Sequence, residues 1–322
     1  MIGTSGVSRR GLLAGAAALA GAAALPGLPR AAATPLGLPI GLQLYSVKDE
    51  MERDVEKTLR AVAAIGYRSV QTNLSIGGWD AKRISALLKS LGVEWRSCHV
   101  SIPELQQGGE RLFDQCRELG IERVISAAPF ARDMSKLKKL PPDHPLVKQF
   151  GEMAASYVEM IQNLDLDDWK WNAEQLNKFG ELAKRSGLSV GYHNHNFEFK
   201  KFGDVVAYDE LLRLTDPALV TLELDCGWMV SAGQDPVDYM ARHPGRYSLL
   251  HIKDLQKGGS SGTGMGVRTT EVGSGTIDWK RIFAAAGKAG IKGYYVEQEP
   301  PYEKPPLESA KISFDYLARL QG

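Results

Sequence analysis

Several features are scarce in this chain of 322 residues, and each scarcity excludes a class of protein. Only three cysteines occur, at Cys98, Cys116 and Cys226, and their spacing fits neither a disulfide framework nor a cysteine zinc site. Neither sign of charge dominates, because 39 basic residues stand against 38 acidic residues. Nucleic acids and anionic membrane surfaces attract a basic excess, so we expect neither as a partner.

Long hydrophobic runs are also missing. The most apolar run, residues 12–25, is rich in Ala and Gly and is short for a membrane span, which argues against a stable membrane anchor. This run follows Arg9-Arg10 and precedes the small residues Ala31-Ala32-Ala33. We therefore predict a twin-arginine signal peptide over residues 1–33, recognition by the Tat export machinery, and a periplasmic or secreted location.

The remainder, residues 34–322, alternates short apolar strands with amphipathic helices. Glycines at the predicted helix ends, such as Gly66, Gly92 and Gly120, precede short buried strands. Strands are predicted at 39–45, 67–71, 93–100, 122–126, 188–192, 219–224, 247–252 and 293–296. Helices are predicted at 55–65, 81–91, 102–119, 144–163, 168–186, 209–214, 236–242, 279–289 and 307–320.

Eight strand-helix units favour a single α/β domain, a (β/α)8 TIM barrel. An open doubly wound sheet is the alternative fold. It lacks support, because no strand is followed by the glycine-rich phosphate motif of a dinucleotide-binding fold or a P-loop.

Four predicted strands of the second half end in residues that bind metals, namely His193, Asp225, His251 and Glu297. Successive members lie 32, 26 and 46 residues apart, which is about one strand-helix unit a step with extra chain in the last. Parallel strands of a barrel bring their carboxyl ends to one face, where catalytic residues gather. Alone, each residue could be a hydrogen-bonded mouth residue or a helix cap; together in strand register they predict a metal site.

The chain resembles the sugar phosphate isomerase/epimerase group of xylose-isomerase-like TIM barrels, whose relatives include inosose dehydratase, tagatose 3-epimerase and hydroxypyruvate isomerase. The resemblance spans residues 38–320. It is carried by Gly41-Leu-Gln-Leu-Tyr45, Gly191-Tyr-His-Asn-His195 with Phe197-Glu198-Phe199, Leu222-Glu-Leu-Asp-Cys-Gly-Trp228, His251-Ile-Lys-Asp254, Val272-Gly-Ser-Gly-Thr-Ile-Asp-Trp279 and Val296-Glu-Gln-Glu299.

This resemblance implies four metal ligands, Glu, Asp, His and Glu, from strands five to eight. Asp225, His251 and Glu297 match that set, whereas His193 stands where the family has its first Glu. Mixed oxygen and nitrogen ligands suit a divalent Mn, Co, Zn or Fe ion, and Mg fits less well beside two imidazoles.

The departure at His193 bears on the reaction. The family's epimerases exchange protons between two metal-bound carboxylates, and a metal-bound neutral imidazole cannot abstract a proton in that way. A single-base mechanism stays open, with Glu297 as the base and Glu198 as the next candidate. Lys253 could polarise a carbonyl and Asp254 could orient a ligand; a surface ion pair is the alternative for both.

Further residues are expected around a substrate. His195 shares the strand face of His193 and could bind metal or substrate. His99 could contact sugar hydroxyls, and Tyr45 and Trp228 could pack against a sugar ring. As lone aromatic residues, the last two could equally belong to the core.

The resemblance and the predicted signal together indicate an exported metal-dependent sugar isomerase or epimerase that removes a proton beside the carbonyl of a non-phosphorylated sugar. A lyase or dehydratase with the same metal site is the first alternative. A periplasmic sugar-binding barrel without catalysis is the alternative of another class. The expected partner is a small-molecule sugar or oxidised sugar.

Overall fold

The computed structural model describes residues 34–259, 262–263 and 266–320. All described residues belong to one compact unit. The predicted signal peptide, residues 1–33, lies outside the described residues and stays a prediction. None of the described helices combines the length and the apolar character that a membrane crossing requires.

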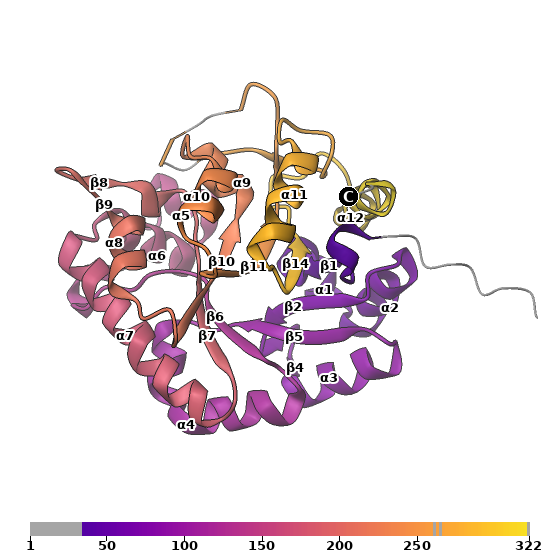
Figure 1. The fold of residues 1–322 in the computed structure, drawn as a ribbon, viewed down its shortest axis with the longest axis horizontal. Helices are drawn as coiled ribbons and strands as arrows, with labels where there is room; N and C mark the ends of the chain where they lie inside the picture. Colours follow the sequence, from indigo (N-terminus) through magenta and orange to yellow (C-terminus); the bar gives the residue numbers. More distant parts are fainter. Residues whose placement is uncertain (1–33, 260–261, 264–265, 321–322) are drawn as a thin grey trace, which may run out of the picture. The chain divides into compact units, whose positions relative to one another are not determined.

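Eight parallel strands close into a barrel, in the order β1-β14-β11-β10-β7-β6-β5-β2 (Figure 1). The strands are β1 (Gly41–Gln43), β2 (Ser69–Asn73), β5 (Glu94–His99), β6 (Arg123–Ser126), β7 (Ser189–His193), β10 (Val220–Asp225), β11 (Tyr247–Ile252) and β14 (Gly293–Val296). The closed order and the parallel pairing confirm the predicted (β/α)8 barrel.

Helices surround the strands (Figure 1). The major ones are α2 (Val55–Ile65), α3 (Ala81–Ser90), α4 (Ile102–Leu119), α7 (Leu166–Arg185), α8 (Ala207–Leu214), α10 (Pro236–Arg242), α11 (Trp279–Ala289) and α12 (Pro306–Arg319). The other helices are α1 (Lys48–Arg53), α5 (Pro145–Phe150), α6 (Glu152–Gln162) and α9 (Cys226–Ser231), with 3-10 turns η1 (Pro35–Gly37), η2 (Leu44–Val47), η3 (Met134–Lys136) and η4 (Phe197–Phe199). Three hairpins lie outside the barrel sheet: β3–β4 (Ser75–Ile76, Trp79–Asp80), β8–β9 (Lys201–Phe202, Val205–Val206) and β12–β13 (Asp254–Leu255, Thr269–Thr270).

Several predicted elements are displaced by one or two residues at their ends, and two others are interrupted or cut short. The helix expected over 144–163 is divided at Gly151, whose φ of 83° and ψ of 164° interrupt the helical backbone. The strand expected over 39–45 ends at Gln43, because the Gln43 side chain accepts the backbone N–H of Tyr45 and begins a 3-10 turn.

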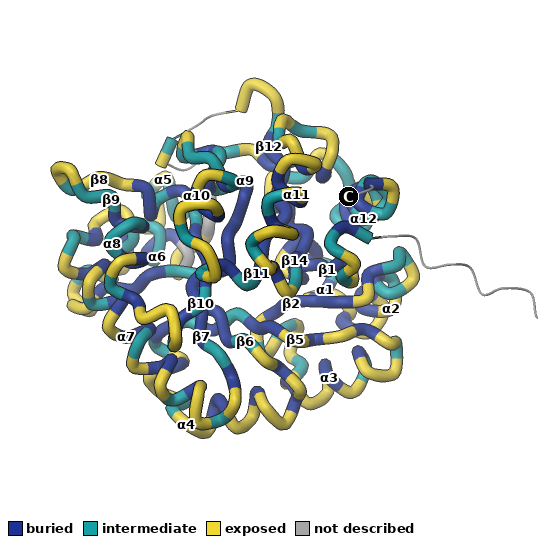
Figure 2. Tube along the Cα trace, in the orientation of Figure 1, coloured by how far each residue is buried: buried dark blue, intermediate teal, exposed yellow. Residues whose placement is uncertain are grey.

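The barrel interior is filled in layers. Ile125, Leu249 and Tyr295 form an apolar cluster that is separate from the main core. Gly41 makes room for it, since a Cβ atom there would lie 2.5 Å from Cδ1 of Tyr295. His251 lies two residues after Leu249, and Glu297 lies two residues after Tyr295. Because side chains alternate along a strand, His251 and Glu297 point to the same side as this cluster, nearer the carboxyl ends of the strands. The strands are buried, whereas the helices expose their outer faces (Figure 2).

Asp254, which follows β11, anchors the segment that leads into α11. Its buried carboxylate accepts the backbone N–H groups of Gly273, Thr276 and Ile277 at 2.9, 3.0 and 3.2 Å, and the indole N–H of Trp279 at 2.9 Å. The alternative of a surface ion pair for Asp254 is therefore wrong. A buried carboxylate with several N–H donors stabilises a segment that has little regular structure of its own.

We predict that Asp254→Ala lowers the free energy of unfolding by about 3 to 5 kcal/mol, since it leaves several buried donors without an acceptor. Asp278→Ala is the control. Asp278 is exposed and caps α11 by accepting the Arg281 N–H, so its loss should cost about 1 kcal/mol. Urea unfolding of both variants beside the parent protein measures the difference. Equal losses would show that Asp254 is no more than another cap.

Candidate active site

Four consecutive strands bring the predicted metal ligands together. His193 ends β7, Asp225 ends β10, His251 lies near the end of β11, and Glu297 directly follows β14. All four side chains are buried, and one donor atom from each lies within 4.8 Å of the other three. Strand register explains this meeting, because Asp225 pairs with His251 across β10 and β11. Residues separated by up to 104 positions (297 minus 193) thus form one cluster.

The spacing of these atoms suits a metal ion. Asp225 Oδ2 lies 4.0 Å from His193 Nε2 and 3.9 Å from His251 Nδ1. Glu297 Oε2 lies 2.8 Å from His251 Nδ1. Ligand atoms about 2.1 Å from one ion are roughly 3.0 to 3.5 Å apart, so small shifts would complete the coordination.

The environment of the Asp225 carboxylate indicates whether a cation fits this site. Its Oδ2 atom is buried and makes no hydrogen bond of acceptable geometry among the described residues, although Lys253 Nζ lies 3.2 Å away. A buried carboxylate oxygen without a donor is costly, and a metal ion would satisfy it. The residues present therefore fit a divalent ion.

Lys253 lies beside this cluster with no exposed side-chain area. Its ammonium group is 3.2 Å from Asp225, 3.1 Å from Glu297 and 2.5 Å from Glu299, and 4.4 Å from the centre of a Trp228 ring. Gly227 permits this packing, since a Cβ atom there would lie 2.5 Å from the Lys253 carbonyl oxygen. A surface ion pair, the alternative considered for Lys253, is therefore wrong.

The charges of the site do not balance without a further cation. Four carboxylates meet here, those of Glu223, Asp225, Glu297 and Glu299. Only Lys253 and a protonated His251 oppose them within the cluster. A divalent ion held by a neutral His251 would reduce the excess from two negative charges to one.

The pKa values follow from these contacts. Burial raises the pKa of Asp225 to about 6, against the opposing charges of Lys253 and His251. Burial alone would lower the pKa of His251, but the charges of Glu223 and Glu297 raise it to about 10. Despite burial, Lys253 and His251 hold the pKa of Glu297 well below its usual range. Glu297 is therefore an ionised carboxylate at neutral pH.

The structure places Glu198 in the loop that follows β7. Its buried carboxylate accepts the Tyr192 hydroxyl at 2.8 Å and the His195 backbone N–H at 2.9 Å. These contacts fit a residue that fixes the loop carrying His195. Its predicted role as a base stays a prediction.

His195 and Trp228 form an aromatic wall beside the cluster. The His195 ring stacks on Phe197 with centroids 4.8 Å apart, and lies 4.9 Å from His193 and 5.7 Å from Trp228. His195 belongs to neither group of four metal-binding side chains found among the described residues, so His193 is the strand-five member of the cluster. Tyr45, by contrast, is 43% exposed on η2.

His99 reaches the cluster from β5 on the side of the barrel interior. Its Nε2 atom lies 2.8 Å from Glu223 Oε1, and its ring stacks on His251 with centroids 5.4 Å apart. Glu223 and Gln71, which the sequence reasoning missed, lie under the cluster and are hydrogen bonded to each other at 2.6 Å. The sequence could have indicated Glu223, because it lies two residues before Asp225 and alternation along a strand puts both side chains on the same face.

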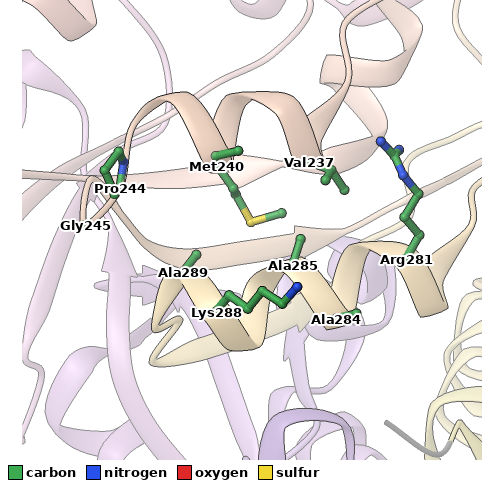
Figure 3. A pocket seen from close by; sticks show the side chains of 10 residues that line it. Val237, Met240, Pro244, Gly245, Arg281, Ala284, Ala285, Lys288 and Ala289 are labelled. Atoms are coloured by element: carbon green, nitrogen blue, oxygen red, sulfur yellow. The ribbon is translucent and has the colours of Figure 1, made fainter.

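A separate cavity of about 530 Å³ lies between α10 and α11 (Figure 3). Small and apolar side chains line most of it, and Arg281 and Lys288 are its charged lining residues. It has no histidine or carboxylate among its lining residues and contains no member of the cluster. It is therefore not the candidate active site.

Comparison with known proteins identifies the family. Residues 59–320 match the family described as Xylose isomerase-like TIM barrel, and the chain belongs to it. It is 30% identical over 185 residues to an inosose dehydratase of Clostridium beijerinckii, an alignment that covers 53% of this chain and 61% of that protein. The chain thus spans about three-fifths of the length of that curated relative.

Solved structures share the fold. A sugar phosphate isomerase/epimerase of Parabacteroides distasonis superposes with a TM-score of 0.66 at 26% identity, covering 87% of this chain and 93% of that one. The IOLI protein, solved with a bound zinc atom, superposes with a TM-score of 0.61 at 11% identity, covering 86% of this chain and 96% of that one. At 11% identity, the likeness to IOLI concerns the fold alone.

The pKa of His251 predicts how the stability of the metal-free protein depends on pH. The folded pKa of about 10 exceeds the ordinary value of 6.5, so folding holds this proton more tightly. Its stabilisation is complete below about pH 6.5 and is lost as pH rises towards 10, by up to about 1.4 kcal/mol per pH unit.

Urea unfolding with EDTA between pH 6.5 and 9.5 measures this slope. His251→Gln should flatten the slope relative to the parent protein. His243→Gln should not, because burial lowers the pKa of His243 and its titration lies below this window. Parallel curves for the parent protein and His251→Gln would refute the prediction.

Proposed function

We propose that this member of the xylose isomerase-like TIM barrel family is a metal-dependent isomerase or epimerase that removes a proton beside the carbonyl of a non-phosphorylated sugar or oxidised sugar. One observation carries the proposal: four metal-binding side chains, from four consecutive strand ends, meet at the carboxyl face of the barrel. Binding a sugar without chemistry requires no such cluster, which argues against a non-catalytic sugar-binding barrel.

His193, Asp225, His251 and Glu297 would hold a divalent Mn, Co, Zn or Fe ion. When bound, the metal supplies a Lewis acid that polarises the substrate carbonyl and stabilises negative charge on its oxygen. The zinc bound to IOLI supports a transition metal in this fold. Two imidazoles in the cluster favour such a metal over Mg.

Glu297 is the proposed base. Its Oε2 atom contacts His251 and Lys253, whereas its Oε1 atom accepts no hydrogen bond from the described residues. One oxygen can therefore help to bind the metal while the other takes the proton. An ionised carboxylate beside the polarised carbonyl has the protonation state that a general base requires.

Lys253 and the aromatic wall would position the substrate. The Lys253 ammonium lies between Glu297 and Glu299, so it can donate to a substrate oxygen near the base. His195 and Trp228 offer ring faces, and apolar ring faces pack well against a sugar. His99 contacts Glu223 on the side of the barrel interior, so it is a weaker candidate for substrate binding than His195 or Trp228.

A dehydratase reaction is the second candidate, and the pairing of Lys253 with Glu297 favours it. A base and an ammonium donor 3.1 Å apart can remove a proton beside a carbonyl and protonate the hydroxyl that leaves from the neighbouring carbon as water. The inosose dehydratases among the relatives support this reading. His193 supports it as well, because an imidazole at that position supplies no second carboxylate base.

The proposed location is the periplasm or the cell exterior, reached through a twin-arginine signal over residues 1–33. A non-phosphorylated substrate fits that location, since sugar phosphates are cytoplasmic. The absence of a glycine-rich phosphate motif from the sequence fits the same substrate class.

Metal content is the first test. The parent protein, purified without added metal or chelator, should contain about one transition-metal ion per chain by elemental analysis. Asp225→Ala and Glu297→Gln should lose it, because each removes a ligand. Glu271→Gln is the control, since Glu271 is a buried carboxylate that pairs with Lys304 outside the cluster. A metal-free parent protein that also fails to bind Mn, Co or Zn would end the proposal.

Proton abstraction is the second test. The metal-loaded protein should incorporate solvent deuterium beside the carbonyl of a keto-sugar substrate, measured by NMR or mass spectrometry. Glu297→Gln should slow this exchange by about 100-fold or more, the usual effect of losing a general base. Loss of water from the substrate would assign the dehydratase reaction. An undiminished rate in metal-saturated Glu297→Gln would remove Glu297 as the base.

A further inference from the structure

We propose that Glu223 is a positioning residue that decides which nitrogen of His193 and which nitrogen of His251 faces the metal. The inference rests on the metal site of the proposed function. Glu223 itself would not bind the metal. It lies on β10, two residues before Asp225, and its side chain is fully buried.

Two groups of potential metal ligands overlap in this barrel. One joins His193 and His251 to Asp225 and Glu297, and the other joins the same two histidines to His99 and Glu223. A neutral imidazole has one lone-pair nitrogen, so each histidine can ligate in only one of these groups. The hydrogen bond made by its other nitrogen decides which group that is.

Glu223 faces the inner nitrogen of each shared histidine. Its Oε1 atom lies 3.0 Å from His193 Nδ1 and 3.1 Å from His251 Nε2. The same oxygen lies 2.8 Å from His99 Nε2. A carboxylate is only an acceptor, so the nitrogens that face it carry the protons. These contacts leave Nε2 of His193 as its lone-pair nitrogen. His251 Nδ1 faces Glu297 Oε2 at 2.8 Å, and because Glu297 is itself a proposed ligand, Nδ1 is the His251 nitrogen that would face a shared ion.

Gln71 reinforces this assignment for His251. Its amide nitrogen donates to Ser97 Oγ at 2.7 Å and to Glu223 Oε2 at 2.6 Å, which turns its carbonyl oxygen towards His251. That oxygen lies 2.6 Å from His251 Nε2 and also accepts the Gln43 amide at 2.9 Å. The inner nitrogen of His251 therefore faces two acceptors.

The outer nitrogens face an oxygen that accepts no hydrogen bond among the described residues, although Lys253 Nζ lies 3.2 Å from it. His193 Nε2 and His251 Nδ1 lie 4.0 and 3.9 Å from Asp225 Oδ2, which is buried without a hydrogen bond among the described residues. Both carboxylate oxygens of Glu223 in the inner group have hydrogen bonds. The outer group has the hydrogen bond between His251 and Glu297 but leaves Asp225 Oδ2 without one among the described residues. The geometry thus directs the metal to the outer group and leaves Glu223 behind the ligands.

Glu223 also restores charge at a changed position. His193 stands where the family resemblance implies a glutamate ligand, and Glu223 pairs with His193 across β7 and β10. A carboxylate that accepts the N–H of a ligating imidazole makes that imidazole a stronger ligand. The negative charge that His193 does not carry is thereby supplied from the next strand.

The test compares metal affinity in Glu223→Gln with that in the parent protein, by competition with a chromophoric chelator for Zn and Co. We expect the variant to keep one ion per chain but to bind it about 10- to 100-fold more weakly, the usual effect of losing a residue that supports a ligand. The visible spectrum of the Co(II) form should also change, because the two imidazoles are held less firmly.

Asp168→Asn is the matched control. Asp168 is equally buried and accepts several hydrogen bonds at the start of α7, away from the cluster, so its loss should leave metal affinity and the Co(II) spectrum unchanged. Unchanged affinity and spectrum in Glu223→Gln would overturn the inference. Loss of the ion in Glu223→Gln with retention in Asp225→Ala would also overturn it, since the metal would then occupy the inner group.

A second measurement needs no variant. In the Zn-loaded parent protein with ¹⁵N-labelled histidine, long-range ¹H–¹⁵N spectra should show His193 protonated at Nδ1 and His251 protonated at Nε2. The reverse assignment for either residue would overturn the inference. A parent protein that binds neither Zn nor Co would instead refute the proposed function, so the two failures are distinguishable.

Discussion

A carboxylate that is removed from water must find a cation or several hydrogen-bond donors, because leaving it unpaired costs several kcal/mol. This constraint explains much of the barrel mouth. Glu223 meets it with three imidazoles and the Gln71 amide, and Glu297 meets it with His251 and Lys253. Asp225 meets it only in part. Its Oδ2 atom is buried and makes no hydrogen bond among the residues that the structure describes, and a metal ion would satisfy it.

Strand β11 shows how one short segment serves both stability and the site. Alternation along the chain directs His251 and Lys253 into the barrel and Asp254 away from it. The inward pair adds positive charge beside Asp225. The outward carboxylate binds the segment between β13 and α11 through backbone N–H groups and Trp279. Because these residues are adjacent, the loop is tied to the element that carries the proposed metal ligand.

His193 stands where the family resemblance implies a glutamate ligand, and this difference bears on the proposed reaction. Membership in the xylose isomerase-like family establishes the barrel and its carboxyl face as the place to look for a site. An imidazole in place of a carboxylate reduces the negative charge beside the proposed metal and removes one potential base. Glu223, on the neighbouring strand, supplies a negative charge beside His193. Because Glu223 is buried beneath the histidines, it does not face the proposed substrate. The proposed reaction is therefore one that needs a single base.

Much of the fold was predictable from the sequence, because hydrophobic periodicity and turn residues act locally. Helices α2, α10 and α11 and strand β11 begin and end where the pattern placed them. Local signals were weaker where a side chain or a single glycine intervened, as at Gln43 and Gly151. The short helix α9 was missed because it begins directly at the end of β10, with Asp225 as its cap.

The sequence by itself determined the type of residue at each strand end, and with it the candidate ligands His193, Asp225, His251 and Glu297. Only the tertiary structure decided how these residues meet. Burial turned Lys253 from a possible surface residue into a partner of three carboxylates, and barrel closure placed Glu223 against His193 and His251, the two candidate ligand histidines. The physical reason is that charge and hydrogen bonding depend on distances between strands far apart in the chain, which closure of the barrel sets.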